Sequence, residues 1–121
     1  MTQSNLDDGN STLLPIWDRA VALERLGGDE ALLSELMEML LDQISGGIAH
    51  LSEAIGRGDA REVEQIAHSL KGASANLGAE RFRQCAFQLE QLGRSGNLSG
   101  AANALAKLQE EAELLHRTFR S

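Results

Sequence analysis

Apolar residues recur at helical spacing from about residue 13 to the end of the chain. In the first such segment, "IWDRAVALERL", we expect Pro15 to open a short helix that Gly27 and Gly28 end. Asp29 should cap a second helix, "DEALLSELMEMLLDQI", in which apolar residues surround nearly the whole circumference. We therefore expect this helix to be covered on two sides, by the main core and by the first helix. Its apolar residues are Leu32, Leu33, Leu36, Met37, Met39, Leu40 and Leu41.

The same apolar phase continues beyond Gly46 and Gly47. This continuity predicts one long second helix with a loosened middle and room for a bend near Gly46. The stretch "GRGD" should end it. Asp59 and Glu62 then have the spacing of a capping box, which predicts a third helix over about 60–77.

Two further amphipathic segments complete the chain. Gly78 should end the third helix, and the turn "RSGN" separates the fourth helix from the fifth. Short connections force consecutive helices to run antiparallel. The sequence therefore predicts an all-α fold, an antiparallel up-down four-helix bundle with a short extra N-terminal helix across one end, as a single domain over residues 13–121. The last two apolar faces consist of Phe82, Cys85, Ala86, Leu89 and Leu92, and of Leu98, Ala101, Leu105, Leu108, Ala112, Leu115 and Phe119.

Composition and charge narrow the functions that such a bundle can have. The net charge of −7 argues against nucleic acid as a partner, because phosphate backbones require clustered Lys and Arg. Cys85 is the only cysteine, which excludes an internal disulfide and a Cys-based zinc cage. We interpret it as a small buried hydrophobe. No stretch has the length of a signal peptide or a membrane span, so we expect a cytoplasmic protein without a membrane partner.

The start of the chain is polar and rich in Gly, Asn and Ser, which predicts a poorly ordered leader over residues 1–12. An initiating Met1 and this leader favour a free-standing protein over a piece of a larger sensor kinase.

The third predicted helix contains a histidine and a glycine that do not contribute to its apolar stripe. On a helical wheel of about 100° per residue, His68 points about 160° away from the centre of that stripe and must face water. Gly72 lies one turn after it and costs about 1 kcal/mol relative to Ala in a helix interior. Access to the imidazole is the natural compensation for that loss. The other neighbours of His68 on this face are Glu64, Gln65 and Ala75.

Lys71 adds a cation beside this histidine. An exposed imidazole of ordinary pKa, about 6.5, is mostly neutral at pH 7, so its nitrogen lone pair can act as a nucleophile without further activation. Lys71, three residues after His68, can swing its ammonium toward whatever the imidazole holds. A mobile point charge suits a phosphoryl group. These residues therefore indicate nucleophilic capture of a phosphoryl group.

The segment "AHSLKGASANLG" resembles the signature of the histidine phosphotransfer (HPt) family, roughly H-x-L-K-G-[AS]-[AS]-x-x-[LIV]-G. "RLGGDEALLSEL" is similar to the family's usual opening, so the resemblance spans about residues 13–119. It implies that His68 accepts a phosphoryl group from a receiver-domain aspartate and passes it to another, while Lys71 steadies the charge and Gly72 leaves room for the partner. The signature is met by His68, Leu70, Lys71, Gly72, Ala73, Ser74, Leu77 and Gly78.

The resemblance also implies partners and a local departure. The partners would be receiver domains of response regulators and a hybrid sensor histidine kinase, bound by a monomer without a cofactor, with Mg²⁺ only in the partner receiver. Many members carry a Gln on the following helix that hydrogen-bonds the imidazole. The matching position here is Glu90, which would bring negative charge near a phosphorylated histidine. The expected partner-binding residues are Glu64, Gln65, Ala75 and Glu90.

The other candidate residues have simpler interpretations. His50 and His116 have no partner at a metal-ligand spacing, so we expect no metal site and interpret both as structural or merely exposed. Trp17 should plug one end of the bundle. The acidic residues of the last helix should form its solvated face, namely Glu110, Glu111 and Glu113.

Two classes of function stay open at this point. The chain has no Gly-rich phosphate loop, so we expect neither ATP binding nor kinase activity of its own. A phosphotransfer protein is the first interpretation. The alternative is a helical docking or regulatory module that binds a kinase or receiver domain without transferring phosphate, because the same surface patch could serve either role.

Overall fold

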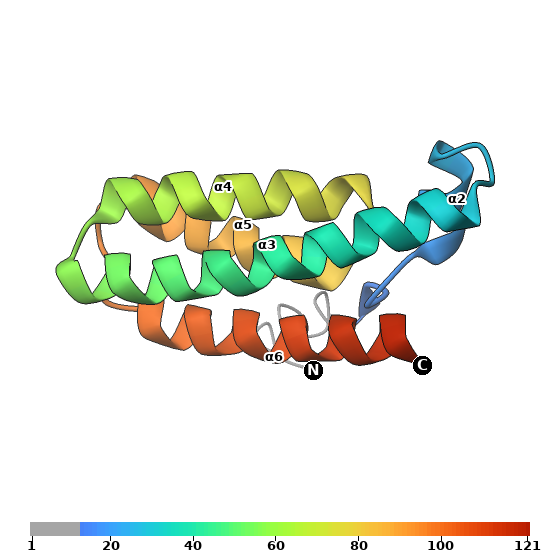
Figure 1. The fold of residues 1–121 in the computed structure, drawn as a ribbon. Coiled ribbons are helices and arrows are strands. Elements are labelled where there is room, and N and C mark those ends of the chain that lie inside the picture. Colours follow the sequence, from blue (N-terminus) through green and yellow to red (C-terminus); the bar gives the residue numbers. More distant parts are fainter. Residues whose placement is uncertain (1–12) are drawn as a thin grey trace.

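The computed structural model describes residues 13–121, which contain five α-helices and no strand (Figure 1). The predicted all-α class is confirmed. The leader expected over 1–12 lies outside the described residues. The helices are α2 (Arg19–Arg25), α3 (Glu30–Arg57), α4 (Ala60–Asn76), α5 (Glu80–Ser95) and α6 (Ala101–Arg120).

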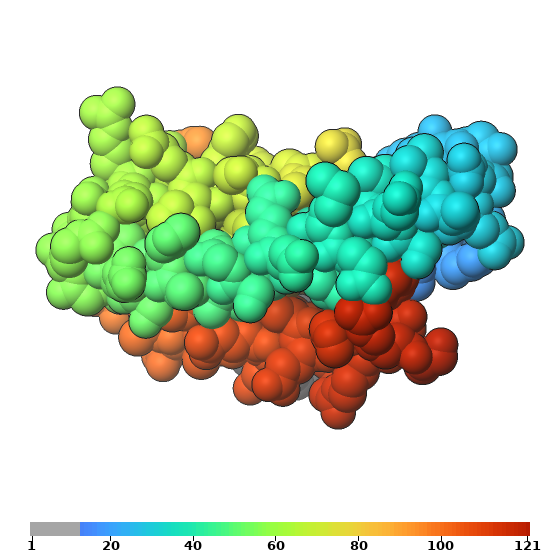
Figure 2. All heavy atoms as spheres, viewed as in Figure 1, coloured from blue at the N-terminus to red at the C-terminus, as the bar shows by residue number. Residues whose placement is uncertain are grey.

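The four long helices form the predicted antiparallel bundle. α3 packs beside α4 and α6, and α5 packs beside the same two helices, so the four surround one core. On the face drawn in Figure 2, α3 forms a band between α4 and α6. The short α2 lies at one end, next to the start of α3 and the connection from α4 to α5, as Figure 1 shows. The predicted placement of the extra helix across one end is confirmed.

The buried face of α4 agrees with its predicted stripe. Val63, Ala67 and Leu70 are almost completely buried. Ser74 is buried among them, and its hydroxyl donates a 2.7 Å hydrogen bond to the Leu70 carbonyl, which satisfies its polar group. Cys85 is buried on α5, as expected of a small hydrophobe. Because the stripe fixes how α4 is rotated in the bundle, it also fixes which side chains face outward.

Aspartate caps begin α3 and α4 as predicted. Asp29 accepts from the backbone N–H of Leu32, and Asp59 accepts from the backbone N–H of Glu62. The second half of the expected capping box is wrong, because the Glu62 side chain pairs with Arg57. The backbone N–H of Asp59 instead donates to the Ala54 carbonyl at the end of α3.

The prediction that Pro15 opens the first helix is wrong. α2 begins only at Arg19, behind an Asp18 cap. The residues before it hydrogen-bond to the end of the bundle rather than to a helical turn. The Pro15 carbonyl accepts from the Arg81 backbone N–H, and the Trp17 indole donates to the Leu77 carbonyl at 2.9 Å. Trp17 thus helps to close that end of the core.

Gly78 lets this N-terminal segment approach the bundle closely. Its φ is +76°, a left-handed conformation that favours glycine, and its carbonyl accepts from the Asp18 backbone N–H at 2.8 Å. A β-carbon at Gly78 would lie 2.6 Å from the Asp18 carbonyl oxygen. The residue that ends α4 therefore also fixes the start of α2.

The loosened middle expected in the second helix is also wrong. α3 continues without interruption through Gly46 and Gly47. A β-carbon at Gly47 would lie 2.9 Å from the Leu70 side chain, whereas one at Gly46 would contact nothing within 4 Å. Gly47 therefore permits close packing of α3 against α4.

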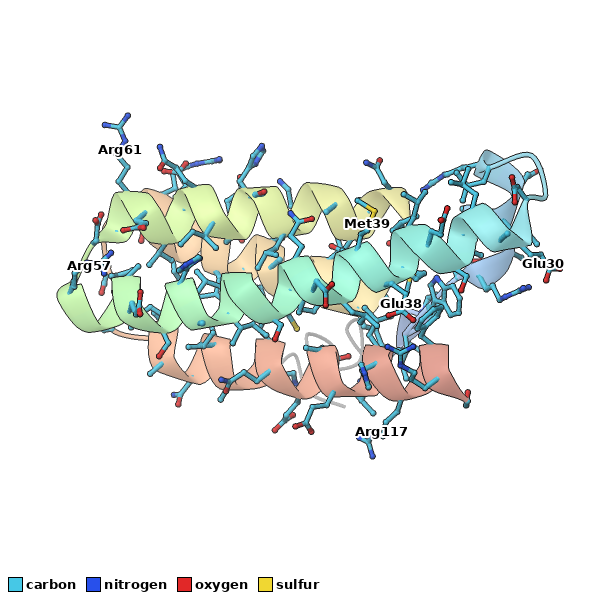
Figure 3. The ribbon with its side chains drawn as sticks, viewed as in Figure 1. Glu30, Glu38, Met39, Arg57, Arg61 and Arg117 are labelled. Carbon is cyan, nitrogen blue, oxygen red and sulfur yellow. The ribbon has the colours of Figure 1, made fainter. Side chains whose placement is uncertain are left out.

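Two expectations about exposure are corrected. The second helix is not covered on two sides: Met39 is 64% exposed (Figure 3), because α2 has only seven residues and sits at the end of the bundle. Glu111 does not belong to the solvated face of α6, although Glu110 and Glu113 do. It is buried and pairs with Arg81 of α5 at 2.8 Å, which compensates its charge.

Candidate functional site

His68 faces outward from α4, on the side opposite its buried stripe. Its side chain is 67% exposed, which confirms the orientation predicted from the helical period. The Nδ1 atom lies 2.7 Å from Oε2 of Glu90 on the adjacent helix α5. The imidazole is therefore open to solvent and also held at one nitrogen.

Glu90 is a buried carboxylate surrounded by cationic groups. Only 2% of its side chain is exposed. Lys71 Nζ lies 2.7 Å from Oε1, an ion pair by distance, and Arg94 Nη2 lies 3.2 Å from Oε2. Burial raises the pKa of Glu90, but hydrogen bonds from Lys71 and His68 and attraction to their charges outweigh it, so the pKa falls below its ordinary value. Glu90 is therefore ionised at neutral pH.

The ionised Glu90 carboxylate determines which ring nitrogen of His68 carries the proton. Such a group has no proton to donate, so the contact between Glu90 and His68 requires the proton on Nδ1. In the neutral ring, the lone pair then belongs to Nε2. This nitrogen is therefore the ring atom that is able to act as a nucleophile.

Lys71 lies next to His68, as the sequence predicts, but its ammonium is engaged by Glu90. The side chain is largely buried, and Nζ also lies 5.1 Å from the centre of the Phe87 ring. The cation and the imidazole thus share one carboxylate.

Gly72 provides open space one turn after His68. It is exposed, and a β-carbon built there would contact nothing within 4 Å. The absence of a side chain therefore has no packing reason within residues 13–121. The missing side chain leaves the surface beside the His68 ring unobstructed. This agrees with the interpretation that access to the ring compensates the cost of a glycine inside a helix.

The other predicted site residues are distributed unevenly around the ring. Half-buried Glu64 accepts from Arg94 Nε at 3.0 Å, and exposed Gln65 lines the same shallow pocket as His68. Ala75 instead lies at the α2 junction, where its carbonyl accepts from Arg25 at 2.9 Å. Glu90, expected to bind a partner, is buried and contacts the imidazole from below the surface.

Sequence reasoning missed Arg94 and Gly93. Arg94 links Glu64 to Glu90, and its position four residues after Glu90 on one helix was a usable signal. Gly93 permits the close approach of α5 to α4, since a β-carbon there would lie 2.5 Å from the Glu64 backbone nitrogen. A glycine inside a helix was as anomalous at 93 as at 72.

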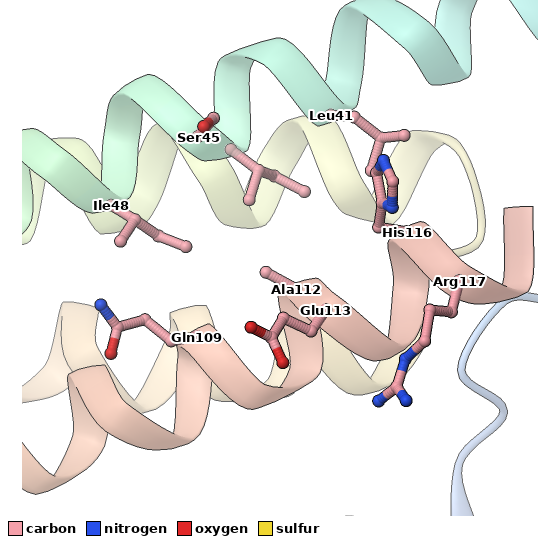
Figure 4. Close-up of a pocket in the computed structure, with 9 residues that line it drawn as sticks. Leu41, Ser45, Ile48, Gln109, Ala112, Glu113, His116 and Arg117 are labelled. Carbon is pink, nitrogen blue, oxygen red and sulfur yellow. The ribbon is translucent and has the colours of Figure 1, made fainter. Parts of the chain in front are cut away.

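The other two histidines lie in different surroundings. His50 and His116 are both exposed. Figure 4 shows His116 beside Leu41 in a hollow between α3 and α6, away from the α4–α5 pair. Within residues 13–121, His68 is the only histidine hydrogen-bonded to another side chain.

Residues 13–121 contain neither a metal-binding cluster nor a membrane-spanning helix. No group of three or more His, Cys, Asp or Glu side chains there could hold a metal ion. No helix in this part of the chain is long and apolar enough to cross a bilayer.

Two solved structures with the same fold are described as phosphotransfer proteins. The structure is similar to histidine-containing phosphotransfer protein B (HptB) from Pseudomonas aeruginosa PAO1, with a TM-score of 0.82 and 25% identity over 88% of this chain and 92% of that one. A rice protein described as a histidine-containing phosphotransfer protein has the same fold, with a TM-score of 0.76 and 21% identity over 87% of this chain and 79% of that one. A comparison with curated proteins found no match.

The family assignment rests on the chain itself. The Hpt domain model matches residues 35–118, well over half of the sequence. That span contains α4 and α5, and with them His68, its partner Glu90, and the two cations that pair with Glu90, Lys71 and Arg94. The chain therefore belongs to the Hpt domain family.

Proposed function

We propose that this chain is a phosphorelay intermediate whose phosphoacceptor is His68. Membership of the Hpt domain family carries the histidine phosphotransfer function itself. The observation that supports His68 as the acceptor is its geometry: an imidazole 67% exposed, held at Nδ1 by a buried carboxylate, with Nε2 free. No other histidine in residues 13–121 combines these features.

On this chain, the proposed reaction needs no group beyond these side chains. The Nε2 lone pair attacks the phosphorus of an aspartyl phosphate in a receiver domain, in line with the bond to the aspartate oxygen. That bond breaks, and its electron pair leaves with the aspartate carboxylate. A second receiver aspartate takes the phosphoryl group by the reverse of these steps.

The neighbouring residues have distinct proposed roles. Lys71 neutralises Glu90 in the resting protein and turns toward the phosphoryl charge when it arrives. Gly72 keeps the approach to the ring open for the receiver's active site. The receiver would dock over the face that includes Gln65, with Glu64 and Ala75 at its margins.

Hpt domains work with receiver domains and histidine kinases, and we propose the same classes of partner here. A hybrid sensor histidine kinase would supply the first phosphoryl group, because the chain would not bind ATP itself. We propose that the protein acts as a cytoplasmic monomer and binds no nucleic acid. Mg²⁺ would be required only in the acidic pocket of the receiver, and the chain would need no cofactor.

A transfer assay tests this function. A receiver domain carrying labelled aspartyl phosphate is mixed with wild-type chain and with the His68→Gln variant. We expect acid-labile, base-stable label on the wild type, none on the variant with its fold intact, and release of the label to a second receiver. Binding of the receiver without transfer of label would instead support the alternative, a docking module that transfers no phosphate.

A further inference from the structure

The carboxylate at position 90 differs in kind from the amide that the Hpt resemblance leads one to expect. An amide side chain can turn either its NH₂ or its oxygen toward Nδ1, and so accommodates both ring tautomers. A carboxylate can only accept. In the resting protein Lys71 holds Oε1 of Glu90, while His68 and Arg94 hold Oε2. When Lys71 turns toward the phosphoryl group, the carboxylate loses one neutralising cation and favours a proton on Nδ1 more strongly.

The Glu90 carboxylate also affects the protonation of the ring after phosphorylation. When Nε2 gains a phosphoryl group, a ring that keeps its Nδ1 proton becomes a cationic imidazolium, whereas a ring that loses the proton is neutral. An anion 2.7 Å away from Nδ1 favours the cationic form. On the basis of the proposed function of His68, we propose that Glu90 retains the Nδ1 proton throughout the phosphorylation cycle and so keeps the phosphorylated ring a good leaving group.

The atoms and charges balance without any proton transfer. Nε2 forms the N–P bond with its lone pair, and the ring takes a formal positive charge that the Glu90 carboxylate faces. In the return step, a receiver carboxylate oxygen attacks phosphorus and the N–P electron pair returns to Nε2. The ring is neutral again, with the same proton still on Nδ1. Glu90 acts as a positioning residue, since it contacts the ring and not the phosphoryl group.

The other charged groups around the ring do not replace this contact. Arg94 is bound to two carboxylates, and Lys71 to one. Arg61 projects outward from α4 (Figure 3). On α3, which packs against the other side of α4, His50 lines a groove that does not include His68. The charged residues that line the same pocket as the ring are Arg61 and Glu64 from α4, and Glu90 and Arg94 from α5, while Lys71 of α4 contacts Glu90.

Nitrogen NMR tests the proposal directly. The chain is labelled with ¹⁵N-histidine in a His50→Gln, His116→Gln background. His68 is then the one histidine left of the three in the sequence. Potassium phosphoramidate, a small donor that needs no receiver, phosphorylates the ring. Long-range ¹H–¹⁵N spectra then report across a pH series whether each ring nitrogen is protonated, bare or bonded to phosphorus.

We expect phosphorus on Nε2 and a proton that stays on Nδ1 to a pH about one unit or more higher than in Glu90→Gln. Because one pH unit is a tenfold change in the protonated fraction, loss of the phosphoryl group at mildly alkaline pH should be roughly 3- to 10-fold slower in Glu90→Gln. Glu80→Gln is the matched control. Glu80 lies on the same helix as Glu90 and, within residues 13–121, forms an ion pair with Arg83 alone. The variant therefore removes one charge from that helix and should behave as the wild type.

Identical titrations of the wild type and Glu90→Gln would overturn the proposal, and so would phosphorus on Nδ1. If Glu90→Gln does not fold, the titration of the Nδ1 proton in the protein that keeps Glu90 tests the proposal by itself. Early loss of its Nδ1 proton, at the pH where phosphorylated free histidine loses the same proton, would also overturn the proposal. Because the small donor bypasses the receiver, failure of receiver transfer would count against the proposed function and leave this result untouched.

Discussion

Gly93 of α5 lies so close to Glu64 of α4 that a β-carbon at Gly93 would come within 2.5 Å of the Glu64 backbone nitrogen. One turn from this contact in each helix lie Glu90 and His68, whose side chains meet at 2.7 Å. A carboxylate reaches the imidazole from a buried position because the two backbones are this close. The contact between the helices and the chemistry of the site are therefore linked.

We predict that Gly93→Ala destabilises the fold by about 1–3 kcal/mol, because the added methyl group must push two helix backbones apart. It should also weaken the contact between His68 and Glu90. Urea unfolding measures the loss. Gly46→Ala is the matched control: its β-carbon meets open space, so it should stabilise α3 by about 0.5–1 kcal/mol. Equal effects of the two substitutions would refute the close approach of α4 and α5.

At Gly72 we predict the opposite combination of effects. Gly72→Gln should raise the free energy of unfolding by up to about 1 kcal/mol, since Gln is a better helix former and nothing lies within 4 Å of the new β-carbon. Phosphoryl transfer from a receiver should nevertheless slow by about tenfold or more, because the long side chain obstructs approach to His68. Gly72→Ala should slow transfer less. Unchanged transfer in Gly72→Gln would show that the open surface is irrelevant.

The helical period explains what the sequence could predict. His68 is exposed because 3.6 residues per turn fix its direction relative to the stripe of Val63, Ala67 and Leu70. The caps at Asp29 and Asp59 are equally local, and both are confirmed. Features that depend on two or three consecutive turns of one helix could therefore be predicted from the sequence.

Features that depend on the neighbouring helix were not. Glu111 is polar and was expected in water, yet Arg81 from α5 pairs with it in the interior. In the sequence alone, Gly47 suggests a weak point in the helix. In the structure, the Leu70 side chain of α4 packs against it. Glu90 was found by resemblance, but its burial and its two cations required the packing of α5 on α4. Periodicity describes one helix and not its partner.

The pKa of Glu90 predicts how its contribution to stability depends on pH. Because the folded protein lowers this pKa below its ordinary 4.5, the ionised form stabilises the fold. That contribution is complete above the ordinary value and is lost as pH falls through the lower folded value. In urea titrations, the wild type should therefore lose stability relative to Glu90→Gln as pH falls below 4.5. A difference between the two that stays constant across this range would contradict the assignment.

Cys85 should be chemically silent in the folded protein. Burial raises the pKa of its thiol to about 11, and the nearby Glu111 carboxylate adds to the effect. Thiolate is the reactive form, so Ellman's reagent at about pH 8 should label the native chain only as it unfolds. Labelling in guanidinium chloride should be immediate. Rapid labelling of the native protein would show that α5 opens far more readily than its packing implies.

The position of the phosphoryl group is the most direct test of the whole account. After incubation with a phosphorylated receiver, the chain is digested at alkaline pH and each histidine peptide is examined by mass spectrometry. We predict phosphate on the peptide containing His68 and none on those containing His50 or His116, although all three side chains are exposed. Phosphate on either of the other two, or equal labelling of all three, would contradict the account.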